Sequence, residues 1–207
     1  MRRAIGAAAA AGLSWCSGSA AALEVGQAFV YSDGRVEQVR ELRDTEVVWA
    51  AGNGAPFVRS LNLAAPILEW SIGERKGQRR VYGGEGLFPP KAGRRATLRV
   101  VTEIDRGEGR PPSRSLQFWS CAIGAAEEIA LANGPFAALP IRCDRFAQTS
   151  AALLERRTLW WSAELEHYIK RETIDLRDGE RESILLCAAV PPETSRRRIN
   201  ALARAKC

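Results

Sequence analysis

His167 is the only histidine in the 207-residue chain, so any hydrolytic site built on a histidine general base would have to use it. Glu164, Glu166 and Glu172 lie close to it in the sequence, and a glycoside hydrolase needs two carboxylates facing each other across a cleft. Ser162 also lies nearby, but outside a nucleophile-elbow pattern. Nothing in the sequence fixes this geometry, and a lone histidine between two strands is more typical of a hydrogen-bonded structural residue.

Other catalytic signatures are absent from the sequence. It contains no phosphate-binding GxxxxGK[ST] loop, no GxGxxG dinucleotide fingerprint and no HExxH zinc motif. We therefore expect no cofactor, no metal and no catalysis, and we favour a binding protein. The alternative is a cell-wall or polysaccharide hydrolase centred on His167, Glu164 and Glu166.

Tryptophan side chains supply the strongest signal for ligand binding. Five tryptophans follow the first 22 residues, each in an apolar, strand-like run: Trp49, Trp70, Trp119, Trp160 and Trp161. Such side chains fill a core or, on an exposed curved sheet, contact sugars and acyl chains. Because Trp160 and Trp161 are adjacent, a strand would point them to opposite faces. We predict that any binding site uses Trp160, Trp161, His167 and Tyr168.

The cysteines are spaced for disulfides. Cys121, Cys143, Cys187 and Cys207 remain once Cys16 is set aside with the N-terminal segment, and four cysteines allow three pairings. Both Cys121 and Cys143 lie in strand-like runs, so we predict a bridge between neighbouring strands there. Cys187 would then pair with Cys207 and hold the C-terminus. A zinc site needs close ligand pairs, which this spacing lacks.

Residues 1–22 have the layout of a secretory signal peptide. Arg2 and Arg3 precede an uncharged apolar run of about a dozen residues, and small residues follow up to Ala22. The run is too short for a membrane-spanning helix, which needs roughly 20 apolar residues. Trp15 precedes Cys16, where lipoprotein processing needs a small residue, so lipidation of Cys16 is disfavoured. We predict cleavage near Ala22, a periplasmic location and a single mature domain, 23–207, with no transmembrane segment.

Charge further limits the partners. The chain has a net charge of +6, but acidic and basic residues are interspersed along it. This pattern is typical of a solvated surface and not of a nucleic-acid interface. An oxidising compartment suits the predicted disulfides.

Turn signals separate short apolar runs along the mature chain. Gly52–Gly54 divides two such runs into a hairpin. In 96–104, Leu98, Val100 and Thr102 alternate with Thr97, Arg99, Val101 and Glu103, which predicts a strand with one apolar face. Residues 125–132 have helical composition, but we favour an extended segment because Asn133-Gly134-Pro135 follows. Together these segments predict a mainly β fold, a single antiparallel, strongly curved sheet that forms a half-open barrel or a sandwich.

A C-terminal helix is expected at about 194–206. Ser195 or Thr194 can cap it, and Ile199, Leu202 and Ala203 share one face. Its arginines could meet an acidic partner or lipid headgroups. Its apolar face is narrow, however, so we favour a solvated helix docked on the sheet.

The region from Trp119 to Arg171 resembles a group of uncharacterised bacterial exported envelope proteins, a domain of unknown function. The quoted elements are Trp119-Ser120-Cys121, Asn133-Gly134-Pro135-Phe136, Ile141-Arg142-Cys143 and Trp160-Trp161-Ser162-Ala163-Glu164-Leu165-Glu166-His167-Tyr168-Ile169-Lys170-Arg171. Ala163 replaces the group's usual proline and Glu166 its usual glycine. The resemblance implies a β-rich, exported domain, with an analogy to the half-open barrels of lipoprotein carriers.

The sequence therefore predicts a periplasmic envelope protein without enzymatic activity. Its tryptophan-rich strands favour an apolar or amphipathic ligand, lipid-like or glycan, or else an envelope protein partner. A structural or assembly factor that docks through its basic C-terminal helix is a further alternative.

Overall fold

Antiparallel strands make up most of the computed structural model, which describes residues 23–207 except 108, 133, 149 and 206. The strands are β1 (Ala28–Tyr31), β2 (Val36–Leu42), β3 (Glu46–Ala51), β4 (Pro56–Ser60), β5 (Glu69–Ile72), β6 (Arg75–Tyr82), β7 (Arg95–Asp105), β8 (Ser113–Ile123), β9 (Glu127–Leu131), β10 (Gly134–Ala147), β11 (Leu153–Ser162), β12 (His167–Asp175) and β13 (Arg181–Val190). A short 3₁₀ helix, η1 (Glu85–Leu87), lies before β7, and the helix α1 (Arg196–Ala205) ends the chain.

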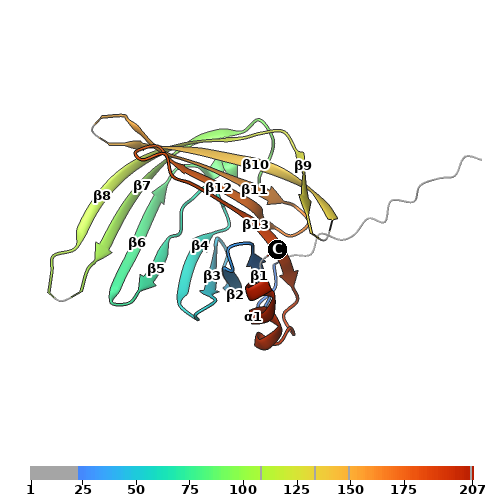
Figure 1. Cartoon of the computed structure of the whole chain (residues 1–207). Coiled ribbons are helices and arrows are strands. Elements are labelled where there is room, and N and C mark those ends of the chain that lie inside the picture. The colour runs from blue at the N-terminus through green and yellow to red at the C-terminus, as the bar shows by residue number, and fades with distance from the viewer. Residues whose placement is uncertain (1–22, 108, 133, 149, 206) are drawn as a thin grey trace, which may run out of the picture.

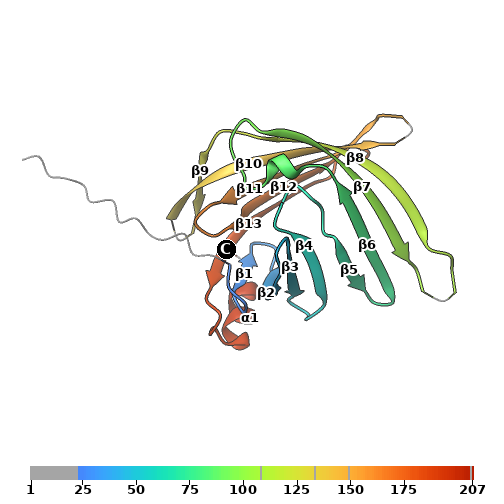
Figure 2. The same ribbon diagram turned by 180° about the vertical axis from the view of Figure 1, so that it is seen from behind.

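The sheet closes on itself as a 12-stranded antiparallel barrel. Each strand from β1 to β7 pairs with the strand that follows it in the sequence. β8 pairs with β10, and β10 to β13 again pair in sequence order. Pairing of β13 with β1 completes the ring. β9 stands outside it, as a flap formed with the first part of β10 (Figures 1 and 2). The predicted curved antiparallel sheet with a C-terminal helix is confirmed, and the sheet forms a barrel.

Strand alternation explains which side chains fill the barrel. On β7, Leu98 and Val100 are fully buried and Thr102 is 5% exposed, so the face predicted to be apolar faces inward. β1 differs, because all four of its residues are buried. Phe29 and Tyr31 join the interior core, whereas its alternate residues pack outside the barrel.

Helix α1 covers that outer side of β1. Ile199 is buried against Ala28 and Val30, with Leu202 and Ala203 packed beside it. The predicted docking face of the helix is therefore the one that packs. The backbone N–H of Arg198 donates to Ser195 Oγ, as expected of a capping residue.

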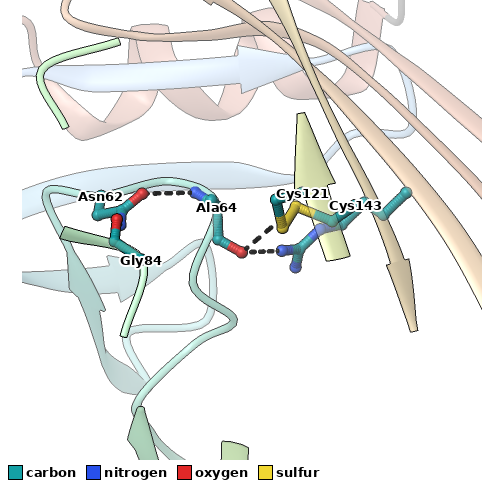
Figure 3. Close-up of a disulfide and its surroundings, with 6 residues drawn as sticks. Asn62, Ala64, Gly84, Cys121 and Cys143 are labelled. Atoms are coloured by element: carbon teal, nitrogen blue, oxygen red, sulfur yellow. Dashed lines mark hydrogen bonds between the residues drawn. A yellow bond between two sulfur atoms is a disulfide. The ribbon is translucent and has the colours of Figure 1, made fainter. Parts of the chain in front are cut away.

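The two predicted disulfides are present. Cys121 on β8 lies directly opposite Cys143 on β10, and Cys187 on β13 is bonded to Cys207 beyond α1. The first bridge faces the interior, where the β4–β5 connection reaches it (Figure 3). In this connection the Ala64 carbonyl oxygen lies 3.8 Å from the disulfide sulfur of Cys143, and Ala64 is fully buried. Residues 61–68 therefore cross the inside of the barrel from β4 to the opposite wall.

Asn62 holds the start of this connection. Its side-chain amide donates to the Gly84 carbonyl at 3.0 Å, and its side-chain oxygen accepts the N–H of Ala64 at 3.1 Å (Figure 3). The two bonds fix the loop to the segment before η1, which keeps it inside the barrel.

The predicted signal peptide and Cys16 lie outside the described residues, so cleavage, lipidation and the division into 1–22 and 23–207 stay predictions. Of the residues described, none forms a helix long and apolar enough to cross a membrane.

Candidate functional site

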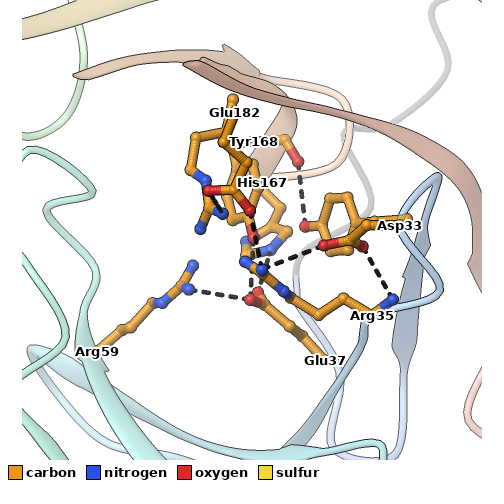
Figure 4. Close-up of polar contacts among 9 residues, drawn as sticks. Asp33, Arg35, Glu37, Arg59, His167, Tyr168 and Glu182 are labelled. Carbon is orange, nitrogen blue, oxygen red and sulfur yellow. Dashed lines mark hydrogen bonds and ion pairs between the residues drawn. The ribbon is translucent and has the colours of Figure 1, made fainter. Parts of the chain in front are cut away.

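Glu37 on β2 is the centre of a buried polar network. Its side chain faces the barrel interior and the residue is 2% exposed. Its Oε1 accepts hydrogen bonds from Arg59 Nη2 on β4 and from Tyr168 Oη on β12, both at 2.9 Å (Figure 4). The Tyr31 hydroxyl donates in turn to the Tyr168 carbonyl, and the two tyrosine rings stack. Four strands are joined by this network.

The electrostatics of the network favour an ionised carboxylate. Burial alone would raise the pKa of Glu37, but the Arg59 guanidinium, together with the His167 and Tyr168 contacts, lowers that pKa to about 2. Burial would likewise lower the pKa of Arg59, but the Glu37 charge overrides it and raises that pKa. Glu37 and Arg59 therefore form a buried ion pair, with side chains 3% and 12% exposed.

His167 is a buried structural residue in this arrangement. It is 1% exposed and its ring packs on Phe29 and Trp49, with centroids 4.3 and 4.7 Å away. Burial lowers the pKa of His167 more than the neighbouring Glu37 charge raises it, so the imidazole is neutral at pH 7. Its Nε2 lies 3.4 Å from Glu37 Oε2. This placement matches the structural interpretation of the lone histidine.

The structure does not bring His167 together with the predicted carboxylates. Glu164 is an exposed turn residue. Glu166 lies in the same turn, with a positive φ of 47°, and its Oε2 accepts the Leu23 N–H at 3.4 Å. Glu172 forms an ion pair with Lys170 on the partly exposed face of β12. These residues form no cleft around the imidazole.

The remaining predicted binding residues also pack into the fold. Tyr168 is fully buried in the Glu37 network. Trp160 is 8% exposed; its indole N–H donates to Glu127 of the β9 flap, and Lys170 lies over its ring. Trp161 is half-buried and packs against the interior core. Whether any of them contacts a ligand stays a prediction.

A second feature, which the sequence analysis missed, is a cavity of about 300 Å³ inside the barrel. Five arginines from five strands line it, and Glu155 is the only acidic residue in its wall; the arginines are Arg59, Arg79, Arg145, Arg157 and Arg171. Apolar side chains complete the wall, among them Trp119, Leu159 and residues of the β4–β5 connection. We call this space the arginine cavity.

Three of these arginines have carboxylate partners. Arg59 pairs with Glu37, Arg145 pairs with Glu155 at 2.9 Å, and Arg171 pairs with Glu182 at 2.8 Å. Glu182 lies at the surface with a side chain 47% exposed, and it also binds Arg35 (Figure 4). The charges of these three arginines are therefore largely balanced before any ligand arrives.

Arg157 and Arg79 have no carboxylate partner among the residues described. Arg157 donates from Nη2 to the Ala64 carbonyl at 2.7 Å and stacks on Trp119, 4.6 Å from the ring centre. Arg79 donates to the Ile67 carbonyl at 2.9 Å and stacks on Trp70 at 4.2 Å. Burial lowers the pKa of Arg157 to about 10, and it remains charged at pH 7. Two guanidinium charges in the wall are thus not neutralised.

The cavity could have been found from strand parity. Arg145 stands two residues after the core residue Cys143, and Arg157 two residues before Leu159, so both share an inward face with apolar residues. Arg79 likewise stands two residues before Val81. A charged residue on an otherwise apolar strand face is the signal that the sequence analysis did not use.

Among the described residues, no cluster of three or more histidine, cysteine, aspartate or glutamate side chains is placed to hold a metal ion. The charged side chains that line the arginine cavity are five arginines and one glutamate. Guanidinium groups recognise carboxylate, sulfate and phosphate groups, not cations.

Comparisons with known proteins identify the fold. No protein-family model matches the chain, and no curated protein matches it. Among solved structures it is similar to the hypothetical lipoprotein YmcC from Escherichia coli K12, with a TM-score of 0.51 and 9% identity over 79% of this chain and 86% of that one. A putative exported protein with a YmcC-like fold from Bacteroides fragilis NCTC 9343 gives a TM-score of 0.38 and 13% identity over 81% of this chain and 97% of that one. The likeness to the Escherichia coli structure shows that the barrel has the YmcC fold.

Proposed function

We propose that the protein is an exported envelope protein that binds an amphipathic ligand inside its barrel without transforming it. The arginine cavity is the observation that carries the proposal. It combines apolar wall residues with guanidinium groups in one concave space, and ligand sites in proteins are typically concave and combine apolar walls with polar groups that orient the ligand.

The export half of the proposal rests on the sequence. Residues 1–22 have the features of a cleavable signal peptide, and both disulfides of the barrel need an oxidising compartment to persist. The Escherichia coli protein of the same fold is described as a lipoprotein, which agrees with an envelope location.

The burial of His167 disfavours the hydrolase alternative. A general base must come within hydrogen-bond reach of the substrate or of a water molecule, whereas His167 is 1% exposed and enclosed by aromatic rings. Glu164 lies in an exposed turn, so the three residues of that proposal have no common face toward a substrate.

Native mass spectrometry of the protein from the periplasm tests the binding proposal. We expect extra mass that is released on denaturation, either directly or after incubation with lipid and glycan extracts of the cell envelope. Gln117→Trp fills the cavity and should remove this mass, whereas Phe118→Trp, on the opposite face of β8, should keep it. A bare protein under all of these conditions would refute the proposal.

A further inference from the structure

We infer that the arginine cavity is an oxyanion site, which holds the phosphate, sulfate or carboxylate group of its ligand between Arg157 and the neighbouring arginines. The inference rests on the proposed function and specifies it, because it assigns the polar end of the ligand to a chemical class.

The charge balance of the cavity wall favours an anionic ligand. Five arginines face one cavity, but only three carboxylates pair with them. Glu155 lies in the wall of the cavity, and Glu37 and Glu182 lie outside it. Each of these acids already has an arginine partner. The excess of two positive charges, in Arg157 and Arg79, matches a dianionic group. An uncompensated charge away from bulk water is costly, so its partner is expected to come from outside the chain.

The unused donors are the second argument. The Nε atoms of Arg145, Arg157 and Arg171 are all buried and have no hydrogen-bond partner. A buried donor without an acceptor costs free energy. Guanidinium groups bind oxyanions through several N–H groups at once, and an oxyanion offers several acceptor oxygens to match them.

The orientation of Arg157 is the third argument. Its guanidinium is held from one side by the Ala64 carbonyl and supported by the Trp119 ring. Arg145 also lies over the Trp119 ring, 6.0 Å from its centre. Both cations are therefore positioned before the ligand binds, which reduces the entropy lost on binding.

Access to the cavity comes from the end of the barrel where β7 and β8 are joined. Ser115 lines the cavity and is exposed, whereas Trp119, further along β8, is 5% exposed. An amphipathic ligand would therefore place its charged group among the arginines and its apolar part along Trp119 and Leu159.

The test compares two adjacent arginines. Arg157→Gln removes the uncompensated charge from the cavity, and Arg156→Gln is its matched control, because Arg156 pairs with Asp144 on the other face of β11. Three probes are titrated into the full mature protein: inorganic phosphate, decyl phosphate and the uncharged decyl maltoside. Binding is measured by calorimetry and by the shift of the thermal unfolding midpoint.

We expect decyl phosphate to bind wild type and Arg156→Gln equally, and Arg157→Gln at least about tenfold more weakly. Ligand-free Arg157→Gln should unfold at a higher temperature than wild type, because it no longer buries an unpaired charge. This second readout shows that the variant is folded. A purely structural Arg157 would give the opposite shift, which would contradict the inference.

The probes separate the two proposals. Binding of inorganic phosphate as tight as that of decyl phosphate supports the oxyanion site but refutes an amphipathic ligand. Binding of decyl maltoside alone supports the proposed function and overturns the oxyanion site. If neither phosphate compound binds, the oxyanion site is refuted, and the native mass then decides the proposed function independently.

Discussion

Replacing Glu37 with glutamine should change the acid stability of the barrel more than any surface substitution. The carboxylate of Glu37 is held inside the barrel by Arg59 and Tyr168, and its pKa is about 2 in the folded protein, against an ordinary value of 4.5. Glu37→Gln keeps the size and hydrogen-bonding shape of the side chain but removes its charge. The difference in the free energy of unfolding between wild type and Glu37→Gln should therefore depend on pH.

The sign and size of this dependence follow from the two pKa values. At pH values between the folded pKa of about 2 and the ordinary pKa of 4.5, the carboxyl group is protonated in the unfolded chain but ionised in the folded chain. Wild-type stability therefore rises with pH in this range. The contribution is complete above the ordinary pKa of 4.5 and is lost as pH falls through the folded pKa of about 2. The full shift corresponds to roughly 3 kcal/mol, of which about 2 kcal/mol is lost by pH 3.

Urea unfolding followed by tryptophan fluorescence measures this difference from pH 7 down to pH 3. The free energy of unfolding of wild type, relative to that of Glu37→Gln, should fall by about 2 kcal/mol from pH 7 to pH 3. Taking the difference between the two proteins removes most contributions from titrating groups that lie away from Glu37. His167 is the exception, because the Glu37 charge raises its pKa. Glu41→Gln is the control, because Glu41 pairs with Arg43 at the exposed surface and should leave the unfolding midpoint unchanged. A difference that stays constant with pH would show that Glu37 is not a buried anion.

Two more predictions concern packing and the disulfides. Gly77→Ala should destabilise the barrel by roughly 1–3 kcal/mol, because a Cβ at Gly77 would overlap the Trp70 ring; chemical denaturation measures it. Replacing both Cys121 and Cys143 with alanine should cost about 3 kcal/mol, from the chain entropy of a loop with a sequence separation of 22, read from the shift in the urea midpoint.

Matched variants control both experiments. A Cβ at Gly86 would meet nothing within 4 Å, so Gly86→Ala should leave stability nearly unchanged, and an equal loss in both glycine variants would contradict the packing argument. The Cys187–Cys207 bridge has a similar sequence separation of 20, so its removal should cost a similar amount. A far smaller cost for both bridges would argue against the chain-entropy account.

Strand patterns with one apolar face were predictable from the sequence, but a strand buried on both faces was not. The alternation of Leu98, Val100 and Thr102 identified β7, and the Gly52–Gly54 turn located the β3–β4 hairpin. β1 carries apolar residues on both faces because α1 covers its outer side. β1 could not be identified from the sequence, since an uninterrupted apolar run of four residues has no period of two.

The polar network inside the barrel could not be predicted from the sequence, for a different reason. Glu37 and Arg59 lie on β2 and β4, which flank β3. Tyr168 is 131 residues from Glu37 and comes beside it only through the β13–β1 pairing that closes the ring. His167 and Tyr168 were predicted as binding residues, which stays a prediction, and their partner on β2 was not identified. The two cysteine pairs could be predicted because each lies within a short stretch of sequence and the predicted compartment favours oxidation.

The β1–β13 pairing has a consequence for how the barrel folds. Most strands of the ring find their partner in the next hairpin to emerge, but β1 must wait for β13, so that Phe29 pairs with Ala189 near the end of the chain. Until then the apolar β1 has one unpaired edge, and its outer face lacks α1. The last 27 residues, 181–207, carry β13, α1 and both cysteines of the Cys187–Cys207 bridge. When this segment folds, β13 closes the ring, α1 covers β1 and the disulfide holds the C-terminus. Premature termination anywhere in this segment would leave an open sheet with an exposed apolar edge, a form prone to aggregation and to proteolysis.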